Sequence, residues 1–232
     1  MQLRHDNMSD IFHIIVAAGK GNRFGADKPK QFCLMAGRPV LMETIDRMRQ
    51  YGLGGEIILV LSHEMTAYWA DLCKEYGFES PRVAEGGDTR WQSVKNALEL
   101  IDGTAKIVTV HDGARPLVTK RIIESVISAV ARGHSGALPA VAVTDSMRQR
   151  SANGFVAVDR SSLRAVQTPQ AFRADILRQA YSQPYRDEFT DDASVVESMG
   201  INDIELTEGD QRNIKITHPA DIRIAEIYLS DN

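Results

Sequence analysis

Short apolar runs rich in isoleucine and valine recur along the chain, and polar or glycine-containing segments separate them. Continuous apolar runs of this length, bounded by turn residues, are typical of strands buried in a sheet. The runs lie at residues 11–16, 56–61, 106–110 and 136–143. The sequence therefore predicts buried strands at these positions.

Helical periodicity occupies segments between these runs and after them. Over residues 90–101 one apolar face repeats at helical spacing, formed by Trp91, Val94, Leu98 and Ile101. Thr119 is a suitable N-cap for a helix that continues to about residue 132. Pro219, a favoured first-turn residue, begins a final helix that reaches about residue 229. Strands that alternate with helices predict an α/β fold with a mostly parallel sheet and helices on both faces.

One segment, residues 144–172, interrupts this alternation because it is polar and resembles a hairpin. Ser151–Gly154 supplies turn residues, and the run 155–158 can pair back onto the strand before the turn. A two-stranded hairpin is marginally stable alone in water, so this one is expected to pack on something, such as a second subunit. The alternative is a surface hairpin without a role.

Composition limits the function classes. A chain of 232 residues is long enough for one α/β domain with a large core, here residues 1–232. The net charge of −4 argues against a general nucleic-acid-binding surface, and no apolar run is long enough to span a membrane. Cys33 and Cys73 form no metal-binding spacing and indicate no disulfide framework. Residues 1–10 lack the apolar core of a signal peptide, so a cytoplasmic location is expected.

The strongest chemical signal is the glycine-rich segment 17–25, which directly follows the first predicted strand. Glycines in such a loop allow backbone N–H groups to face phosphate oxygens, and Lys20, Arg23 and Lys30 can neutralise a triphosphate. The third glycine comes one residue late for a dinucleotide fingerprint, and the Lys-Ser or Lys-Thr of a P-loop is missing. The alternative is a solvated turn with scattered charges.

A second glycine pair occurs in the segment 86–94, between a short predicted strand and a helix. Its functional interpretation is recognition of a base by the glycine backbone, the Asp88 carboxylate and the Ser93 hydroxyl. The alternative for Asp88 is a helix N-cap, a position that aspartate favours.

Charged residues follow the strand at 106–110. Asp112 comes at a strand end, where a carboxylate can hold Mg²⁺ or bond to a substrate hydroxyl. Arg115 is a candidate contact for an anionic substrate or for a surface ion pair, and His111 is interpreted as a structural neighbour. Lys215 lies in a short apolar stretch, from which it faces solvent unless it reaches back into the site.

Together these motifs resemble the 2-C-methyl-D-erythritol 4-phosphate cytidylyltransferases, enzymes of non-mevalonate isoprenoid precursor synthesis. The matching pieces occur in the family's order, and the ordered set is more specific than any one piece. They are A-A-G-x-G-x-R with P-K-Q from Ala17, G-G-D-x-R-x-x-S-V from Gly86, H-D-G-A-R-P from His111, Thr168-Pro169-Gln170, Thr190-Asp191-Asp192-Ala193 and Asn213-Ile214-Lys215. Ser146 stands where the family usually has threonine.

The resemblance implies a three-layer, Rossmann-like nucleotidyltransferase fold with a mostly parallel sheet and a protruding β-hairpin arm, residues 144–172, used for dimerisation. It implies a homodimer, in which the arm reaches the partner, and Mg²⁺ as cofactor, with Asp112 as a candidate ligand.

The resemblance also implies roles for individual residues. Arg23 and Lys30 would bind the triphosphate and stabilise the transition state, and Arg160 and Lys215 would position the attacking phosphate. The CTP site would include Ala17, Ala18, Gly19, Gly21, Gly87, Asp88 and Ser93. The sugar-alcohol phosphate site would include Asp112, Arg115, Ser146, Arg160, Thr168, Thr190 and Lys215.

Two alternatives remain at this stage. A ribitol-5-phosphate cytidylyltransferase shares this architecture and most of the motifs. A non-catalytic CTP-binding sensor on the same fold would bind CTP without releasing pyrophosphate, and it would have no use for a second-substrate pocket.

Overall fold

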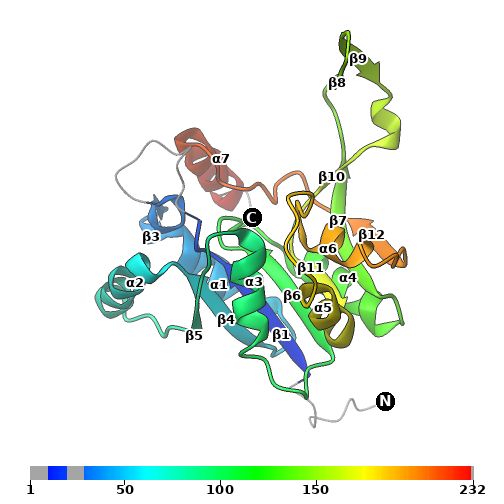
Figure 1. Cartoon of the computed structure of the whole chain (residues 1–232). Coiled ribbons are helices and arrows are strands. Elements are labelled where there is room, and N and C mark those ends of the chain that lie inside the picture. The colour runs from blue at the N-terminus through cyan, green and yellow to red at the C-terminus, as the bar shows by residue number, and fades with distance from the viewer. Residues whose placement is uncertain (1–9, 20–28, 231–232) are drawn as a thin grey trace, which may run out of the picture.

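The structure, a computed structural model, describes residues 10–19 and 29–230. Within these residues the main sheet has eight strands. They are β1 (Ile11–Val16), β4 (Glu56–Leu61), β5 (Arg82–Glu85), β6 (Ile107–Asp112), β7 (Gly136–Ala142), β10 (Arg164–Val166), β11 (Gln170–Arg173) and β12 (Ile204–Glu208). Their order is β10-β7-β11-β6-β1-β4-β5, and β12 pairs with β7. Figure 1 shows this sheet running through the centre of the molecule.

The half of the sheet around β1 is parallel. Strand β1 pairs in parallel with both β4 and β6, and β5 continues the parallel order beyond β4. Val16 is the register partner of Asp112, so β1 and β6 end side by side. The other half is mixed, because β10 and β11 run antiparallel to their neighbours and β12 runs parallel to β7. The predicted mostly parallel α/β sheet is confirmed, and in such sheets ligands usually bind at the edge where the parallel strands end.

Helices cover both faces of the sheet (Figure 1). One face carries α1 (Val40–Tyr51), α2 (His63–Tyr76) and α4 (Lys120–Ala131), and their apolar side chains form one buried cluster with the sheet. The opposite face carries α3 (Arg90–Leu98), α5 (Ala174–Tyr181) and α6 (Asp192–Glu197) around a second cluster. The last helix, α7 (Pro219–Ser230), packs through Ala225 on a smaller third cluster. The predicted three-layer arrangement is therefore confirmed.

The remaining short elements frame the ends of the sheet. Two-residue strands β2 (Leu34–Met35) and β3 (Arg38–Pro39) pair with each other after the 3₁₀ turn η1 (Lys30–Phe32). Within the described residues, no helix has the length and apolar character that a membrane span requires.

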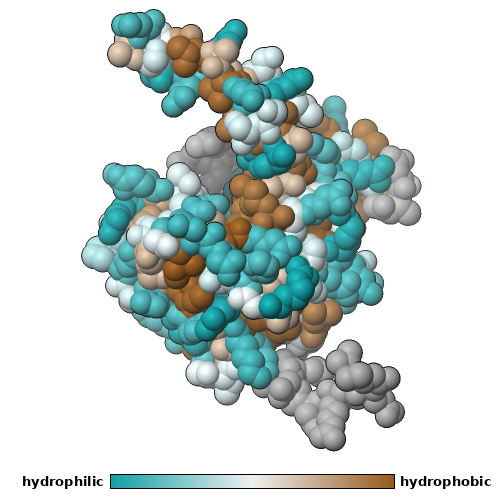
Figure 2. Space-filling model, turned by 90° about the vertical axis from the view of Figure 1, so that its right-hand side faces the viewer, coloured by the Kyte–Doolittle hydropathy of each residue, from teal (hydrophilic) through white to brown (hydrophobic). Residues whose placement is uncertain are grey.

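The predicted hairpin is present and projects from the body between β7 and β10. It consists of β8 (Met147–Ser151) and β9 (Gly154–Val158), followed by the 3₁₀ turn η2 (Arg160–Ser162). Both figures show this arm standing clear of the domain, and Figure 2 shows apolar side chains on it. The interruption of the α/β alternation, predicted for residues 144–172, ends earlier than expected because β10 and β11 already belong to the main sheet.

The structure decides against one of the two alternatives given for Asp88. The N-cap of α3 is Thr89, whose side-chain oxygen accepts a hydrogen bond from the backbone N–H of Gln92. Asp88 therefore does not cap this helix, although its residue type suits that position. At α4 the predicted cap is confirmed, because Thr119 accepts from the backbone N–H of Ile122.

Candidate functional site

A cavity of about 610 Å³ opens where the parallel strands end. Its walls come from the segments that follow β1, β4, β5 and β6, from η1, and from the segment before α7. Clefts outside the carboxyl ends of the strands are the usual ligand sites of open α/β sheets. The residues of the predicted sites that line it are Ala17, Ala18, Gly19, Lys30, Gly87, Asp88, Ser93, Asp112 and Lys215.

On one side of the cavity a glycine turn follows β5. The backbone N–H of Gly87 donates to Ser93 Oγ at 3.1 Å, and Ser93 Oγ donates to the carbonyl of Thr89 at 2.9 Å. A Cβ added to Gly86 would lie 2.4 Å from the Cβ of Ala18, a distance that side chains do not tolerate. The turn therefore packs directly against the segment after β1 because both residues are small.

The segment after β1 is held by a side chain that the sequence analysis quoted but gave no role. Gln31 is buried in η1, and its Nε2 donates to the carbonyls of Ala17 at 2.7 Å and Gly19 at 3.3 Å. The backbone N–H of Ala17 donates to the carbonyl of Val60. These bonds hold the start of the glycine-rich loop in place. The P-K-Q motif, whose glutamine is Gln31, was the feature of the sequence that could have indicated this role.

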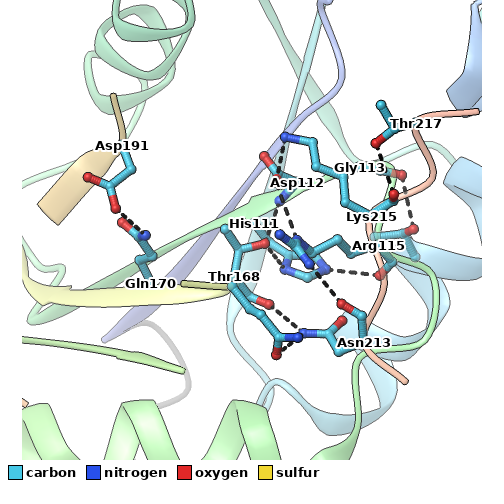
Figure 3. Close-up of polar contacts among 12 residues, drawn as sticks. His111, Asp112, Gly113, Arg115, Thr168, Gln170, Asp191, Asn213, Lys215 and Thr217 are labelled. Carbon is cyan, nitrogen blue, oxygen red and sulfur yellow. Dashed lines mark hydrogen bonds and ion pairs between the residues drawn. The ribbon is translucent and has the colours of Figure 1, made fainter. Parts of the chain in front are cut away.

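On the other side of the cavity, Asp112 lies at the centre of a cationic cluster (Figure 3). Its Oδ2 is 2.9 Å from Lys215 Nζ and 3.4 Å from Arg115 Nε, and its Oδ1 is 3.8 Å from Arg90 Nε. Burial alone would raise the pKa of Asp112, but these three cations outweigh it and hold the pKa well below its ordinary value. Asp112 is therefore ionised, and the cluster keeps a surplus of positive charge beside the cavity.

A chain of hydrogen bonds beneath Asp112 fixes its backbone (Figure 3). The backbone N–H of Asp112 donates to Thr168 Oγ1 at 3.0 Å, which leaves the threonine proton for His111 Nδ1 at 2.9 Å. His111 Nε2 then donates to the carbonyl of Arg115 at 3.2 Å. Burial lowers the pKa of His111 to about 4, so the ring is neutral near pH 7 and acts as part of the framework.

The same framework positions Arg115 and the segment before Lys215. Arg115 Nη1 donates to the carbonyl of Asn213 at 2.7 Å, and Asn213 Nδ2 donates to the carbonyl of Thr168 at 3.0 Å. Asn213 is fully buried, so these bonds tie the late segment to the end of β6. Lys215 reaches back into the site for this reason, although it lies about 100 residues after Asp112 in the sequence.

Arg90 is a residue of the cavity wall that the sequence analysis did not single out. Its guanidinium forms two hydrogen bonds to Asp192, Nη1–Oδ1 at 2.9 Å and Nη2–Oδ2 at 2.7 Å. Two motifs marked these residues in the sequence: Arg90 is the arginine of G-G-D-x-R, and Asp192 is the second aspartate of Thr-Asp-Asp. Sequence alone does not pair two residues that are 102 positions apart.

Other predicted residues lie away from the cavity. Ser146 and Arg160 are exposed on the projecting arm, where Arg160 Nη1 donates to the carbonyl of Thr144. Thr190 is exposed just before the N-cap of α6, and Thr168 is buried beneath Asp112. Arg23 and Gly21 lie outside the described residues. Within one chain, therefore, Arg160 does not meet Lys30 and Lys215 in the cavity wall.

The described residues offer no cage for a resident metal ion. Within residues 10–19 and 29–230, no group of three or more histidine, cysteine, aspartate or glutamate side chains is arranged to hold a metal. The Asp112 carboxylate lies among Lys215, Arg115 and Arg90, and these cations would repel a Mg²⁺ bound there. This donor set does not fit Asp112 as a direct ligand.

A glycine turn that faces a carboxylate–cation cluster across a cavity at the strand ends places this protein among the α/β proteins whose ligand site lies at the carboxyl ends of the sheet strands. The sequence model of one family, described as 2-C-methyl-D-erythritol 4-phosphate cytidylyltransferase, matches residues 11–231. The chain belongs to this family of nucleotidyltransferases of the non-mevalonate isoprenoid pathway. The predicted resemblance is thus confirmed.

Individual relatives agree. The 2-C-methyl-D-erythritol 4-phosphate cytidylyltransferase of Bacteroides thetaiotaomicron is 45% identical over 217 residues, which cover 93% of this chain and 98% of that protein. The Porphyromonas gingivalis protein of the same name is 44% identical and covers 94% of this chain and 97% of its own. The crystal structure of 4-diphosphocytidyl-2C-methyl-D-erythritol synthase from Anaerococcus prevotii superposes with a TM-score of 0.81 at 27% identity, covering 97% of this chain and 100% of that one.

Proposed function

We propose that the protein transfers the cytidylyl group of CTP to 2-C-methyl-D-erythritol 4-phosphate, which yields 4-diphosphocytidyl-2-C-methyl-D-erythritol and pyrophosphate. The observation that carries the proposal is that a glycine turn faces the Asp112–Lys215 ion pair across one cavity. The turn suits a nucleotide, and the cationic cluster suits an acceptor that carries both hydroxyls and a phosphate.

CTP occupies the side of the cavity between β1 and β5 in this proposal. Ala17, Ala18, Gly87, Asp88 and Ser93 surround the cytosine, and all five line that side. The glycine-rich loop with Gly19 and Gly21 receives the triphosphate. Lys30 in the cavity wall and Arg23 in the same loop neutralise the triphosphate and stabilise the charge that develops on the departing pyrophosphate.

The acceptor occupies the side next to β6. Asp112, ionised and accepting, bonds to acceptor hydroxyls, while Lys215 attracts the phosphate. Arg115 shares the Asp112 carboxylate, and Thr168 supports it from beneath. Ser146, Arg160 and Thr190 complete the acceptor site in the proposal.

The chemical step is an in-line displacement. A phosphate oxygen of the acceptor attacks the α-phosphorus of CTP, the P–O bond to the pyrophosphate breaks, and pyrophosphate leaves. The attacking phosphate is already ionised near neutral pH, so no general base is required. Two anions must approach each other, and Lys30, Lys215 and Arg160 lower that cost by positioning them and neutralising their charge.

The divalent cation of this chemistry arrives with the nucleotide in our proposal. Mg²⁺ commonly binds substrate phosphates and keeps several waters, so it needs no protein cage. That mode agrees with the donor set around Asp112, which favours anions over a metal ion. When bound, Mg²⁺ would supply charge neutralisation on the triphosphate.

We also propose that the active unit is a homodimer in which the arm of one chain completes the site of the other. The arm exposes apolar side chains that a monomer leaves uncovered, including Phe155 at 64% and Val156 at 49% exposure. A two-stranded hairpin gains stability by packing on a partner. Arg160 on this arm lies away from the cavity of its own chain, so a partner's cavity is where it would act.

The direct test is pyrophosphate release from CTP with each candidate acceptor in turn. We expect release with 2-C-methyl-D-erythritol 4-phosphate and much slower release with ribitol 5-phosphate when each is supplied alone at the same concentration. Faster release with ribitol 5-phosphate would replace the proposed acceptor. Tight CTP binding without release from any alcohol phosphate would indicate a sensor.

A further inference from the structure

We propose that Arg90 is a positioning residue for the acceptor substrate, because it joins Asp112 to the buried Asp192 and thereby sets the orientation of the Asp112 carboxylate. The inference rests on the proposed placement of the acceptor at Asp112. It adds to that site a residue that does not itself react.

The first support is the geometry of the Arg90–Asp192 pair. Two parallel N–H···O bonds, at 2.9 and 2.7 Å, match the fork of a guanidinium to both oxygens of a carboxylate. Such a pairing fixes the direction of the guanidinium plane as well as its position. A lysine amine in the same place is a point charge and does not impose this direction.

The second support is the rigidity of Asp192. This side chain has no exposed surface, and besides Arg90 it accepts a hydrogen bond from the Tyr181 hydroxyl at 2.6 Å. The Tyr181 ring stacks on Trp91, the residue next to Arg90, with ring centroids 5.8 Å apart. A buried carboxylate held on several sides is a fixed anchor, so the guanidinium that it binds is fixed too.

The third support is the division of the Asp112 oxygens among its cations. Lys215 and Arg115 contact Oδ2, whereas Arg90 Nε faces Oδ1 at 3.8 Å. The terminal torsion of an aspartate is broad, so the rotation of the carboxylate is set by the contacts that its two oxygens make. Arg90 supplies the contact on the second oxygen. Without it, one of the three cations that hold this rotation is missing, and Oδ1 loses its ion pair with Arg90.

Arg90 also connects two segments that serve different substrates. It begins α3, directly after the turn that carries Asp88, and its partner Asp192 begins α6, directly after Thr190 and Asp191. Its own side chain is 30% exposed and faces the cavity from between them. The effect of changing Arg90 should nonetheless fall on the acceptor, because Asp112 lies on that side of the cavity.

The test uses the whole 232-residue chain with Arg90→Lys, which keeps the charge that compensates the buried Asp192 but lacks the two-pronged guanidinium. We expect kcat/KM for the acceptor to fall by about 10- to 100-fold, the range for misplaced positioning groups, while KM for CTP stays near the wild-type value. Asp192→Asn is the second variant, and it should reproduce this pattern if Arg90→Lys does not fold. The matched control is Arg47→Gln, since Arg47 is 17% exposed and paired to Glu43 on α1, outside the cavity wall; it should leave both KM values unchanged.

A double-mutant cycle separates positioning from a general structural role. If Arg90 acts through Asp112, the double variant Arg90→Lys/Asp112→Asn should be no weaker toward the acceptor than Asp112→Asn alone. Additive losses, or equal losses toward CTP and acceptor, would overturn the inference. An Asp112→Asn variant with a wild-type acceptor KM would instead refute the proposed acceptor placement and the inference with it. Unaltered acceptor kinetics in Arg90→Lys beside an impaired Asp112→Asn would refute the role of Arg90 alone.

Discussion

Two buried histidines, His13 and His111, should make the free energy of unfolding depend on pH between about pH 6.5 and pH 4. A solvent-exposed histidine would not have this effect, because its pKa is the same in the folded and the unfolded chain. His13 on β1 and His111 on β6 have the same bonding scheme: Nε2 donates to a backbone carbonyl, and Nδ1 accepts from a threonine hydroxyl. For His13 the partners are Gly52 and Thr109, both at 2.8 Å. Protonation of Nδ1 removes the acceptor that the hydroxyl needs and places a charge in the core.

Burial is the main cause of the pKa of each ring falling from 6.5 to about 4. The unfolded chain therefore binds more protons than the folded chain between pH 6.5 and 4, so stability must fall as the pH drops through this window. With a pKa of 6.5 in the unfolded chain and about 4 in the folded chain, each histidine lowers the free energy of unfolding by about 2 kcal/mol from pH 7 to pH 5. The two together lower it by about 4 kcal/mol. The lowered pKa of Asp112 changes the free energy of unfolding only below about pH 4, so it does not contribute between pH 7 and pH 5.

Urea unfolding at pH 7, 6 and 5, followed by fluorescence of Trp69 and Trp91, measures this free energy at a fixed protein concentration. The variant His13→Gln keeps a donor near the Gly52 carbonyl and removes the titration, so the loss between pH 7 and pH 5 should shrink to about 2 kcal/mol. His218→Gln is the control because His218 is exposed. A flat profile in the wild type, or an unchanged loss in His13→Gln, would refute the argument.

Three further predictions concern the reaction. Lys30→Ala should lower kcat by about 10²–10³-fold and change KM for CTP little, because losing one preorganised contact to the developing charge costs this much. Steady-state pyrophosphate release measures both constants, and a change in KM alone would contradict the role of Lys30. CTP should be preferred over UTP by a factor of ~10⁴, because a site built for the N4 donor of cytosine leaves a buried group unpaired with uracil; equal turnover of both would contradict the base site. Lys30→Ala and Arg160→Ala homodimers should each be nearly inactive, yet mixing them should restore about a quarter of the sites if each site takes one residue from each chain of a twofold dimer. No recovery after confirmed subunit exchange would contradict the shared site.

Elements with strong local patterns were predictable from the sequence. The runs at 11–16 and 56–61 coincide with β1 and β4, because strands buried on both faces are apolar throughout and end where polar or glycine residues begin. Thr119 was recognisable as a cap because it is followed by a helix with one apolar face. At α3 the sequence left a capping role for Asp88 open, and the cap is its neighbour Thr89, since both residue types are good caps and only the backbone path decides between them.

Features that depend on the order of strands were not predictable in this way. β12 lies beside β7, and Arg90 meets Asp192 across the cavity wall, through contacts between distant parts of the chain. The candidate site was partly accessible because its residues sit in recognisable motifs at strand ends. The supporting bonds of Gln31 and the chain from Asp112 to His111 emerge only once the strands are placed side by side.

The contact between Gly86 and Ala18 has a consequence for inhibitors that compete for the base side of the cavity. Resistance to such compounds often arises when a wall residue becomes larger and fills the space that the compound needs. Here a side chain at position 86 would meet the neighbouring segment first, because a Cβ on Gly86 would come within 2.4 Å of the Cβ of Ala18. Escape by steric exclusion at this position would thus distort the proposed CTP site. A compound that contacts Gly86 therefore meets a position where a larger residue clashes, whereas one that reaches the exposed side chains of His63 and Glu85 meets positions with room for larger residues.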